Sequence, residues 1–171
     1  MSKADMLGPI KGSGPTIPLS EAPLNTLIRV DRSIRPVYPD WVKTVMHPEL
    51  ENTGAVIYDL SSIELWLHDW QEKGDYIQAD KIYTYLKKEK MLESCLSLRD
   101  GEEIQKKGPV VFQNFFQSRR IFLWKSVVQN HADKFLVPFY VVMWAGNVKL
   151  NWFFLDDVQS LKHPALRFVG E

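Results

Sequence analysis

The C-terminal third of the chain restricts the fold most, because it holds three runs of aromatic and β-branched residues. They occupy residues 119–129, 134–144 and 148–156 and read RRIFLWKSVVQ, KFLVPFYVVMW and VKLNWFFLD. The turn-like sequences NHAD and AGN separate them, so we expect a three-stranded antiparallel meander. Apolar side chains alternate onto both faces of these strands. Such a sheet has to be covered on both faces.

Helices in the first two thirds are expected to cover one of those faces. We expect a short helix over 39–46, because Pro39 is tolerated in a first turn. Clearer helices are predicted over 75–91 and over 99–116, the latter interrupted or restarted at Pro109.

Residues 58–74 fit two patterns. Ile63, Trp66, Leu67 and Trp70 have the spacing of a helical stripe, whereas Ile63, Leu65 and Leu67 alternate as in a strand. Ser61 and Glu64 have the spacing of a capping box, which favours the helix.

The sequence thus predicts an α+β fold with an extended N-terminal arm, three to four helices and a C-terminal three-stranded antiparallel meander. Residues 1–26 are rich in Gly and Pro and form the flexible or docking arm, and residues 27–171 form one globular domain. The second face of the sheet would need the arm, a further strand or a second copy of the chain.

Composition narrows the compartment and the class of partner. The 21 basic and 21 acidic residues balance, which counts against a dedicated non-specific nucleic-acid binder. No secretory signal is visible, and the longest uncharged run near the C-terminus is too short to span a membrane. The single cysteine, Cys95, cannot form an internal disulfide and lies among leucines, as expected for an inert core thiol of a cytoplasmic protein. We expect no cofactor and no membrane partner.

No phosphate-binding loop, nucleophile elbow or zinc-protease motif is present. The best catalytic candidates are His68 and Asp69, because an imidazole beside a carboxylate can act as a general base. His131 and Asp133 have a spacing that metal ligands can use, but no third ligand is evident, so we expect a polar turn and no metal site.

The first strand of the meander mixes basic and aromatic residues. Arg119, Arg120, Lys125 and Trp124 could bind a single strand of nucleic acid by neutralising phosphates and stacking bases. In the alternative interpretation, which we favour, the rings face the core and the charges lie at the ends of the strand.

The stretch LIRVDRSIRPVYPDW, residues 27–41, is dense in arginine. Arg29, Arg32 and Arg35, with Trp41, are candidates for binding a ligand or an anion, because guanidinium groups bind carboxylate and phosphate with two hydrogen bonds. The favoured alternative is an internal clamp. Residues 47–72 contain six carboxylates and no Lys or Arg, and they would pair with these arginines above Tyr38 and Trp41.

Several stretches resemble a family of small uncharacterised bacterial proteins found in candidate-phylum bacteria. They read IRVDRSIRPVYPDWVKTVMHPELENTG, YDLSSIELWLHD, MLESCLSLRDGEEIQKKG and WKSVVQN. The resemblance implies a bacterial or phage origin and carries no activity.

The sequence therefore favours a non-enzymatic protein-binding or structural module of the bacterial cytoplasm, which binds a protein partner or self-associates. The alternatives are a single-stranded nucleic-acid-binding protein that uses the basic and aromatic sheet face, and a small hydrolase-like enzyme that uses His68 and Asp69.

Overall fold

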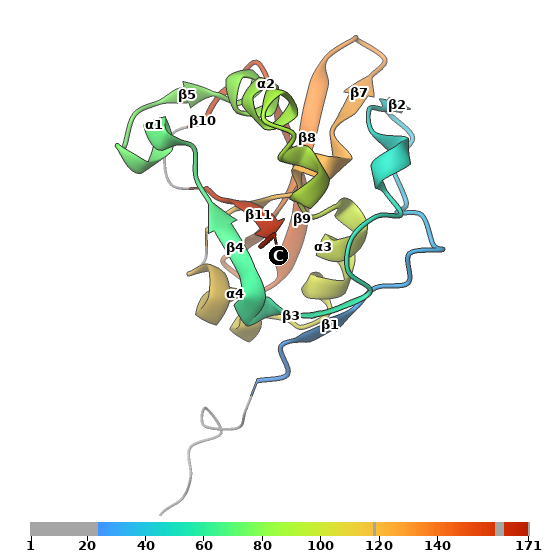
Figure 1. Ribbon diagram of the computed structural model, residues 1–171, viewed down its shortest axis with the longest axis vertical. Helices are drawn as coiled ribbons and strands as arrows, with labels where there is room; N and C mark the ends of the chain where they lie inside the picture. Colours follow the sequence, from blue (N-terminus) through green and yellow to red (C-terminus); the bar gives the residue numbers. More distant parts are fainter. Residues whose placement is uncertain (1–23, 118, 160–162, 171) are drawn as a thin grey trace, which may run out of the picture.

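A curled, mixed sheet of seven strands forms the body of the protein (Figure 1). The computed structural model describes residues 24–117, 119–159 and 163–170. The strand order is β2-β7-β8-β6-β11-β4, and β9 pairs with β8. Their bounds are β2 Val42–Val45, β4 Ile63–Trp66, β6 Ile121–Phe122, β7 Val128–Asn130, β8 Phe135–Val142, β9 Val148–Phe154 and β11 Ala165–Phe168. The β6–β11 pair is parallel, and the other pairs in this sheet are antiparallel.

Two short antiparallel ribbons and four α-helices complete the described part of the chain. One ribbon joins β1 Leu27–Arg29 to β3 Ile57–Asp59, and the other joins β5 Ile77–Gln78 to β10 Val158–Gln159. The helices are α1 Asp69–Glu72, α2 Ala79–Lys88, α3 Leu98–Gln105 and α4 Pro109–Phe116. Short 3-10 turns span Pro48–Leu50, Leu60–Ser62, Leu92–Ser94 and Trp124–Ser126. None of the described helices has the length and apolar character needed to cross a membrane.

The chain's own elements cover both faces of the sheet. On strand β8, Phe139 belongs to a core cluster with Ile82 and Leu86 of α2. The next residue, Tyr140, belongs to a second cluster with Phe112 of α4. Alternation along a strand sends neighbouring side chains to opposite faces, so α2 packs on one face, whereas α3, α4 and the β1–β3 ribbon pack on the other. The covering expected from an arm or a second copy is thus supplied internally at these strands.

The predicted N-terminal arm with a C-terminal three-stranded meander is wrong. A 3-10 turn at Trp124–Ser126 breaks the first expected strand into β6 and β7, so that β8 pairs with β7 along its first half and with β6 along its second. Strands β2, β4 and β11 extend the sheet from distant parts of the sequence. Most of the predicted arm, residues 1–23, lies outside the described residues.

Two predicted helices are strands. The expected helix over 39–46 is β2, whose residues Val42, Thr44 and Val45 pair with β7. The preferred helix over 58–74 is the strand β4 followed by the short helix α1. Strand β4 pairs with β11, about a hundred residues further along the chain. A partner at this distance overrides the local helical stripe.

The helices predicted over 75–91 and 99–116 are present as α2 and as α3 with α4. Pro109 starts α4 after Gly108, whose φ of 84° turns the chain. In the sequence, Asp100 and Glu103 also have the spacing of a capping box, but the N-terminal cap of α3 is different. Ser97 and Asp100 form the capping box one turn earlier.

Gly101 allows α3 to approach β8 closely. A Cβ built on Gly101 would collide with Leu123 Cδ1 and would lie 2.6 Å from Tyr140 Cε2, and both of those side chains are buried. Because Leu123 and Tyr140 are buried, neither side chain can move aside into solvent.

We therefore expect Gly101→Ala to lower the free energy of unfolding by about 1–3 kcal/mol, because overpacking outweighs the gain of roughly 1 kcal/mol in helix propensity. Urea denaturation measures the change. Gly170→Ala is the matched control, since its Cβ would meet nothing within 4 Å. Equal stability of the two variants would contradict this account of the helix–sheet contact.

Candidate binding site along strand β1

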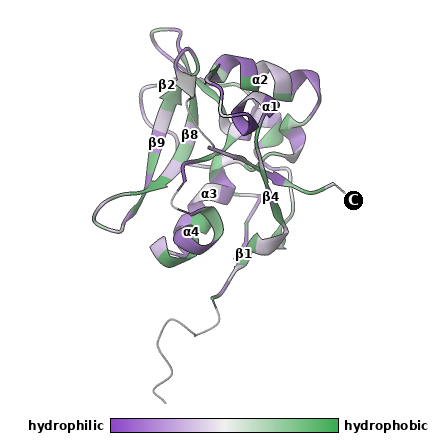
Figure 2. Cartoon of the chain, turned by 90° about the vertical axis from the view of Figure 1, so that its left-hand side faces the viewer, coloured by the Kyte–Doolittle hydropathy of each residue, from purple (hydrophilic) through white to green (hydrophobic). Residues whose placement is uncertain are grey.

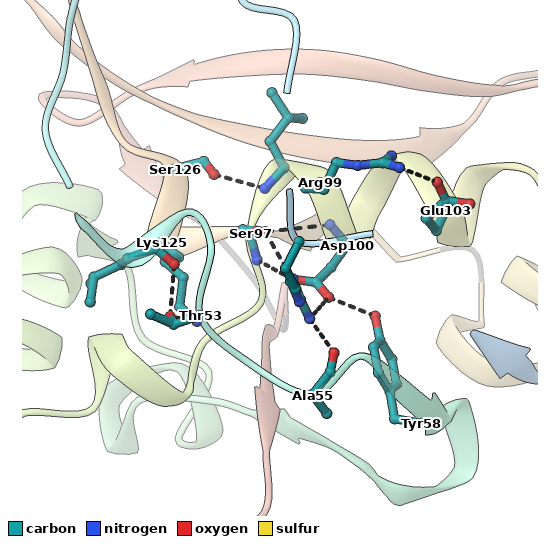
Figure 3. Close-up of polar contacts among 12 residues, drawn as sticks. Thr53, Ala55, Tyr58, Ser97, Arg99, Asp100, Glu103, Lys125 and Ser126 are labelled. Atoms are coloured by element: carbon teal, nitrogen blue, oxygen red, sulfur yellow. Dashed lines mark hydrogen bonds and ion pairs between the residues drawn. The ribbon is translucent and has the colours of Figure 1, made fainter. Parts of the chain in front are cut away.

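A buried carboxylate at the start of α3 organises the arginine-rich segment. Asp100 is fully buried and accepts five hydrogen bonds from three residues (Figure 3). Arg32 donates two of them, from Nη1 at 3.1 Å and Nη2 at 2.8 Å. Tyr58 Oη donates at 3.0 Å, and the backbone and hydroxyl of Ser97 donate at 2.9 and 2.8 Å.

The same guanidinium reaches a second element. Arg32 Nη2 donates to the carbonyl oxygen of Ala55 at 2.5 Å, which ties the loop before β3 to the network. A buried ion pair of this kind is stable only when its remaining hydrogen-bonding groups are satisfied. Here the carboxylate is saturated, whereas Arg32 Nε is buried and has no acceptor in the described part of the chain.

Lys125 lies on another side of this cluster. It is fully buried and donates from Nζ to Thr53 Oγ1 at 3.0 Å. Burial lowers the pKa of its ammonium group, and the charge of Asp100 acts in the opposite direction. Lys125 therefore belongs to the interior of the protein.

An internal ion pair was predicted for the arginines of residues 27–41. Arg32 forms such a pair, but the predicted partner was wrong. Arg32 pairs with Asp100 of α3, not with a carboxylate of residues 47–72. Two of those carboxylates have other partners. Glu51 accepts a hydrogen bond from Tyr38 Oη at 2.5 Å, and Glu64 pairs with Arg167. The burial of Asp100 depends on tertiary structure, so a local charge count could not identify it.

Arg35 and Trp41 do not join Arg32. Arg35 is exposed, and within the described residues it makes no ion pair. Trp41 packs edge-on against Trp152 of β9, with the ring centroids 5.1 Å apart. These two candidates therefore do not share a site with Arg32.

Arg29 lies on the exposed side of β1, next to an open strand edge. In the β1–β3 ladder, Val30 donates to Val56 and Leu60 donates to Thr26, so even-numbered residues of β1 direct their backbone groups toward β3. The backbone groups of Leu27 and Arg29 therefore point away from β3. Asn25 Oδ1 caps the Leu27 N–H at 3.2 Å. Among the described strands β1 pairs with β3 alone, which leaves the Leu27 carbonyl and both backbone groups of Arg29 open.

Two hollows that share lining residues lie beside this ribbon, with volumes of about 310 and 610 Å³. The first is lined by residues of β1 and α3, and the second also reaches Val56 and Ile57 on the β3 side. Both are lined by Arg29 of β1 and Glu103 of α3. The basic residues along them are Arg29, Arg32, Arg99, Lys106 and Lys107, and the acidic residues are Asp31 and Glu103. We call these two hollows together the β1 groove.

The carboxylate in the middle of the β1 groove is already paired. Glu103 contacts Arg99 Nη2 at 2.7 Å and Lys106 Nζ at 2.9 Å. Arg99, like Arg32, has a buried Nε without an acceptor in the described residues. The groove therefore offers more hydrogen-bond donors and positive charge than its own acceptors use. The sequence signal for this half of the site was the run RDGEEIQKK, which we interpreted only as a helix.

His68 and Asp69 are not joined by a hydrogen bond in the described part of the chain. His68 is the N-terminal cap of α1, and its Nδ1 accepts the backbone N–H of Trp70 at 3.2 Å. In the neutral imidazole the proton then resides on Nε2, so the basic nitrogen is engaged by the cap. Asp69 is exposed, and no hydrogen bond joins it to His68 among the described residues.

The predicted basic and aromatic sheet face is not assembled. Trp124 and Lys125 are buried, and Trp124 stacks on Tyr83 and Phe122. Arg120 is exposed and lies over the ring of Phe139, and Arg119 Nε donates to the Phe116 carbonyl. A nucleic acid could therefore reach at most part of this set.

The remaining candidates are structural. Cys95 is buried, which raises the pKa of its thiol to about 12, as expected for an unreactive core residue. Asp133, in the β7–β8 turn, pairs with Lys43 of strand β2. No group of three or more His, Cys, Asp or Glu residues placed to hold a metal ion occurs within the residues that the structure describes.

We expect Asp100→Asn to lower the free energy of unfolding by about 3–5 kcal/mol, because the guanidinium of Arg32 would lose its buried counter-ion. Chemical denaturation measures the loss. Asp156→Asn removes the exposed carboxylate paired with Lys134 at 2.9 Å and should change stability by less than about 1 kcal/mol. A loss at Asp100 as small as this control would show that the network is not a main source of stability.

Tyr58→Phe tests the same network through pH. Burial, followed by the charge of Asp100, raises the pKa of Tyr58 well above its ordinary value of 10.0. The unfolded chain loses this proton above pH 10 while the folded chain keeps it, so the phenol's contribution is complete below about pH 10 and is lost as pH rises.

The variant should be less stable than wild type by about 1.5–3 kcal/mol at pH 7, since a hydrogen bond to a charged group is removed. The gap should shrink by about 1.4 kcal/mol per pH unit above pH 10. Denaturation curves between pH 7 and 11 measure both effects, with Tyr76→Phe at an exposed position as the control. A gap that stays constant with pH would contradict a buried, neutral Tyr58.

Comparisons of the chain with protein-family models, with curated proteins and with solved structures found no match.

Proposed function

We propose that this protein is a non-enzymatic protein-binding module whose strand β1 pairs with an extended, acidic segment of a partner protein. The observation that carries the proposal is the outer edge of β1, where the Leu27 carbonyl and the backbone N–H and carbonyl of Arg29 have no hydrogen-bond partner among the described residues. Both residues line the first hollow of the β1 groove. The proposal keeps the cytoplasm as the compartment, since a single cysteine cannot form an intramolecular disulfide.

An added strand would use the backbone for affinity and the side chains for selection. Main-chain hydrogen bonds to a sheet edge are independent of the partner's sequence, whereas pockets for alternate side chains select it. On the outer face of the ribbon Leu27 and Ile57 are 39% and 50% exposed, and they supply apolar contacts. The β1 edge is three residues long, so the complex would be weak and transient.

Charge selects an acidic partner. The first hollow, beside Leu27 and Arg29, is lined by Arg29, Lys106 and Lys107 against the single carboxylate of Glu103. Glu103 is already bound by Arg99 and Lys106. Arg29 and Lys107 make no ion pair with any residue that the structure describes, so they are the groups proposed to contact the carboxylates of a bound segment. Rim charges of this kind act mainly on association rate and partner choice.

The test uses the full chain and a fluorescein-labelled peptide of four Val-Glu repeats, with binding followed by fluorescence anisotropy. Arg29→Gln should weaken binding about two- to fivefold, the range for one exposed charge pair. Arg35→Gln is the matched control, because Arg35 is exposed and lies outside the groove. A four-fold Val-Lys repeat should not bind.

Peptides N-methylated at alternate residues test the strand pairing itself. Only one of the two alternating sets of N–H groups faces β1, so methylation of one set should abolish binding and methylation of the other should be tolerated. Equal effects of the two methylation patterns, or of Arg29→Gln and Arg35→Gln, would refute pairing at this edge.

A further inference from the structure

A second groove is lined by residues of α1, β5 and α2, and we call it the α1–α2 groove. Both helices lie in the upper part of the molecule as drawn in Figure 2. Its volume is about 430 Å³, within the range of small-molecule sites, and its lining is mostly apolar. The principal lining residues are His68, Trp70, Ile77, Lys81, Tyr85 and Lys88. None of them lines the β1 groove, so a ligand at this second groove would be independent of the proposed function.

Stacked rings fix the wall of this groove. Tyr85 stacks on Trp66, with the ring centroids 5.9 Å apart and the planes 16° from parallel. His68 packs edge-on against Tyr85 at 4.8 Å. These contacts pack Tyr85 and His68 against the wall, while Tyr85 and Trp70 stay 38% and 47% exposed. A ligand would therefore meet aromatic surface that is already ordered, which lowers the entropy cost of binding.

Two lysines lie on the α2 side of the groove. Lys81 Nζ lies 5.8 Å from the ring centroid of Trp70, and Lys88 follows seven residues later on the same face of the helix, about 10 Å along its axis. No carboxylate lines the groove, and neither lysine has an ion pair within the described residues. The groove thus has two positive charges that the described residues do not neutralise.

The imidazole of His68 adds a directed donor. Its Nδ1 is held by the backbone N–H of Trp70, so Nε2 carries the proton and can only donate in the neutral ring. The groove thus combines aromatic surface, two ammonium groups and an imidazole N–H. Apart from the hydroxyl groups of Thr84 and Tyr85, which can donate or accept, the polar groups of the lining are donors, which suits a ligand that supplies acceptors.

From this combination we propose that the α1–α2 groove binds a small aromatic anion, a planar ring that carries a phosphate or a carboxylate. The ring packs against Trp70 and Tyr85, where stacking contributes about 1–3 kcal/mol in comparable sites. The anionic group contacts Lys81 or Lys88 and gains a charge-assisted hydrogen bond. Phosphate and carboxylate are both anionic acceptors for an ammonium group, so the groove as described fits either. The experiment below distinguishes an aromatic phosphate from an aromatic carboxylate.

The experiment titrates the ¹⁵N-labelled full chain with AMP, with indole-3-acetate, and with adenosine and inorganic phosphate as the separated halves of AMP. The indole N–H signals of Trp66 and Trp70 report binding at the groove. At least one of the two aromatic anions should saturate these signals with a Kd at least tenfold below those of adenosine and phosphate. Stronger binding of AMP or of indole-3-acetate identifies the preferred anion.

Charge variants locate the anionic group. Lys81→Gln with Lys88→Gln should weaken binding of the aromatic anion about five- to tenfold and leave adenosine unchanged. Lys90→Gln with Lys149→Gln is the matched control, since it removes two exposed lysines that line neither groove. All four positions are exposed, so loss of folding is not expected to obscure the result.

Three outcomes would overturn the proposal. The first is no saturable shift of either indole signal with AMP or indole-3-acetate up to about 10 mM. The second is equal weakening by the control pair. The third is binding of oligo(dT) far tighter than that of any mononucleotide, which would identify a single-stranded nucleic-acid surface.

Discussion

The pairing of Arg32 with the buried carboxylate of Asp100 holds the upstream part of the described chain on its core. It joins residues 68 positions apart, and the same cluster fastens β3 through Tyr58 and the preceding loop through the Ala55 carbonyl. Because Asp100 also belongs to the cap of α3, the helix start and the β1–β3 ribbon are fixed by a single group. Burying these two charges costs free energy. The five hydrogen bonds that the carboxylate accepts offset this cost.

This anchoring determines how β1 is presented. Ile28 and Tyr58 face inward over α3, and the opposite side of the ribbon faces outward with its edge along the β1 groove. A loosely attached three-residue strand would fray, and an open edge would then have no fixed geometry. The structural role of Arg32 and the binding role that we propose for Arg29 are therefore linked. One arginine holds the strand, and the other lies beside its free edge.

Local sequence patterns located the elements whose stabilising contacts are periodic. The helices α2, α3 and α4 and the long strands β8 and β9 lie where the sequence indicated. Strands β2 and β11 were missed because their partners lie far away in sequence. The strand pattern of β4 was recognised, but the helical stripe in the same residues was preferred. The residues of the candidate site likewise include some that the sequence identified and some that it did not. The sequence pattern identified Arg29 and Arg32, whereas Asp100, Arg99 and Lys107 come close to them only in the folded chain. In the same way, no local sequence feature of Trp124 and Lys125 shows that both are buried.

The burial and the contacts of the reactive side chains indicate which chemistry remains possible at the surface. His68 has its basic nitrogen engaged in a helix cap, Cys95 is buried with a raised pKa, and Asp100 is saturated by five donors. Each of these groups could serve as a base or nucleophile in another setting, and here the fold uses each for its own stability. What stays accessible in the two grooves is mainly of the opposite kind: ammonium and guanidinium groups, an imidazole N–H and a backbone N–H, beside apolar and aromatic surface. Donors without matching acceptors favour binding of anionic groups over acid–base chemistry, and for this reason both proposals for this chain concern recognition.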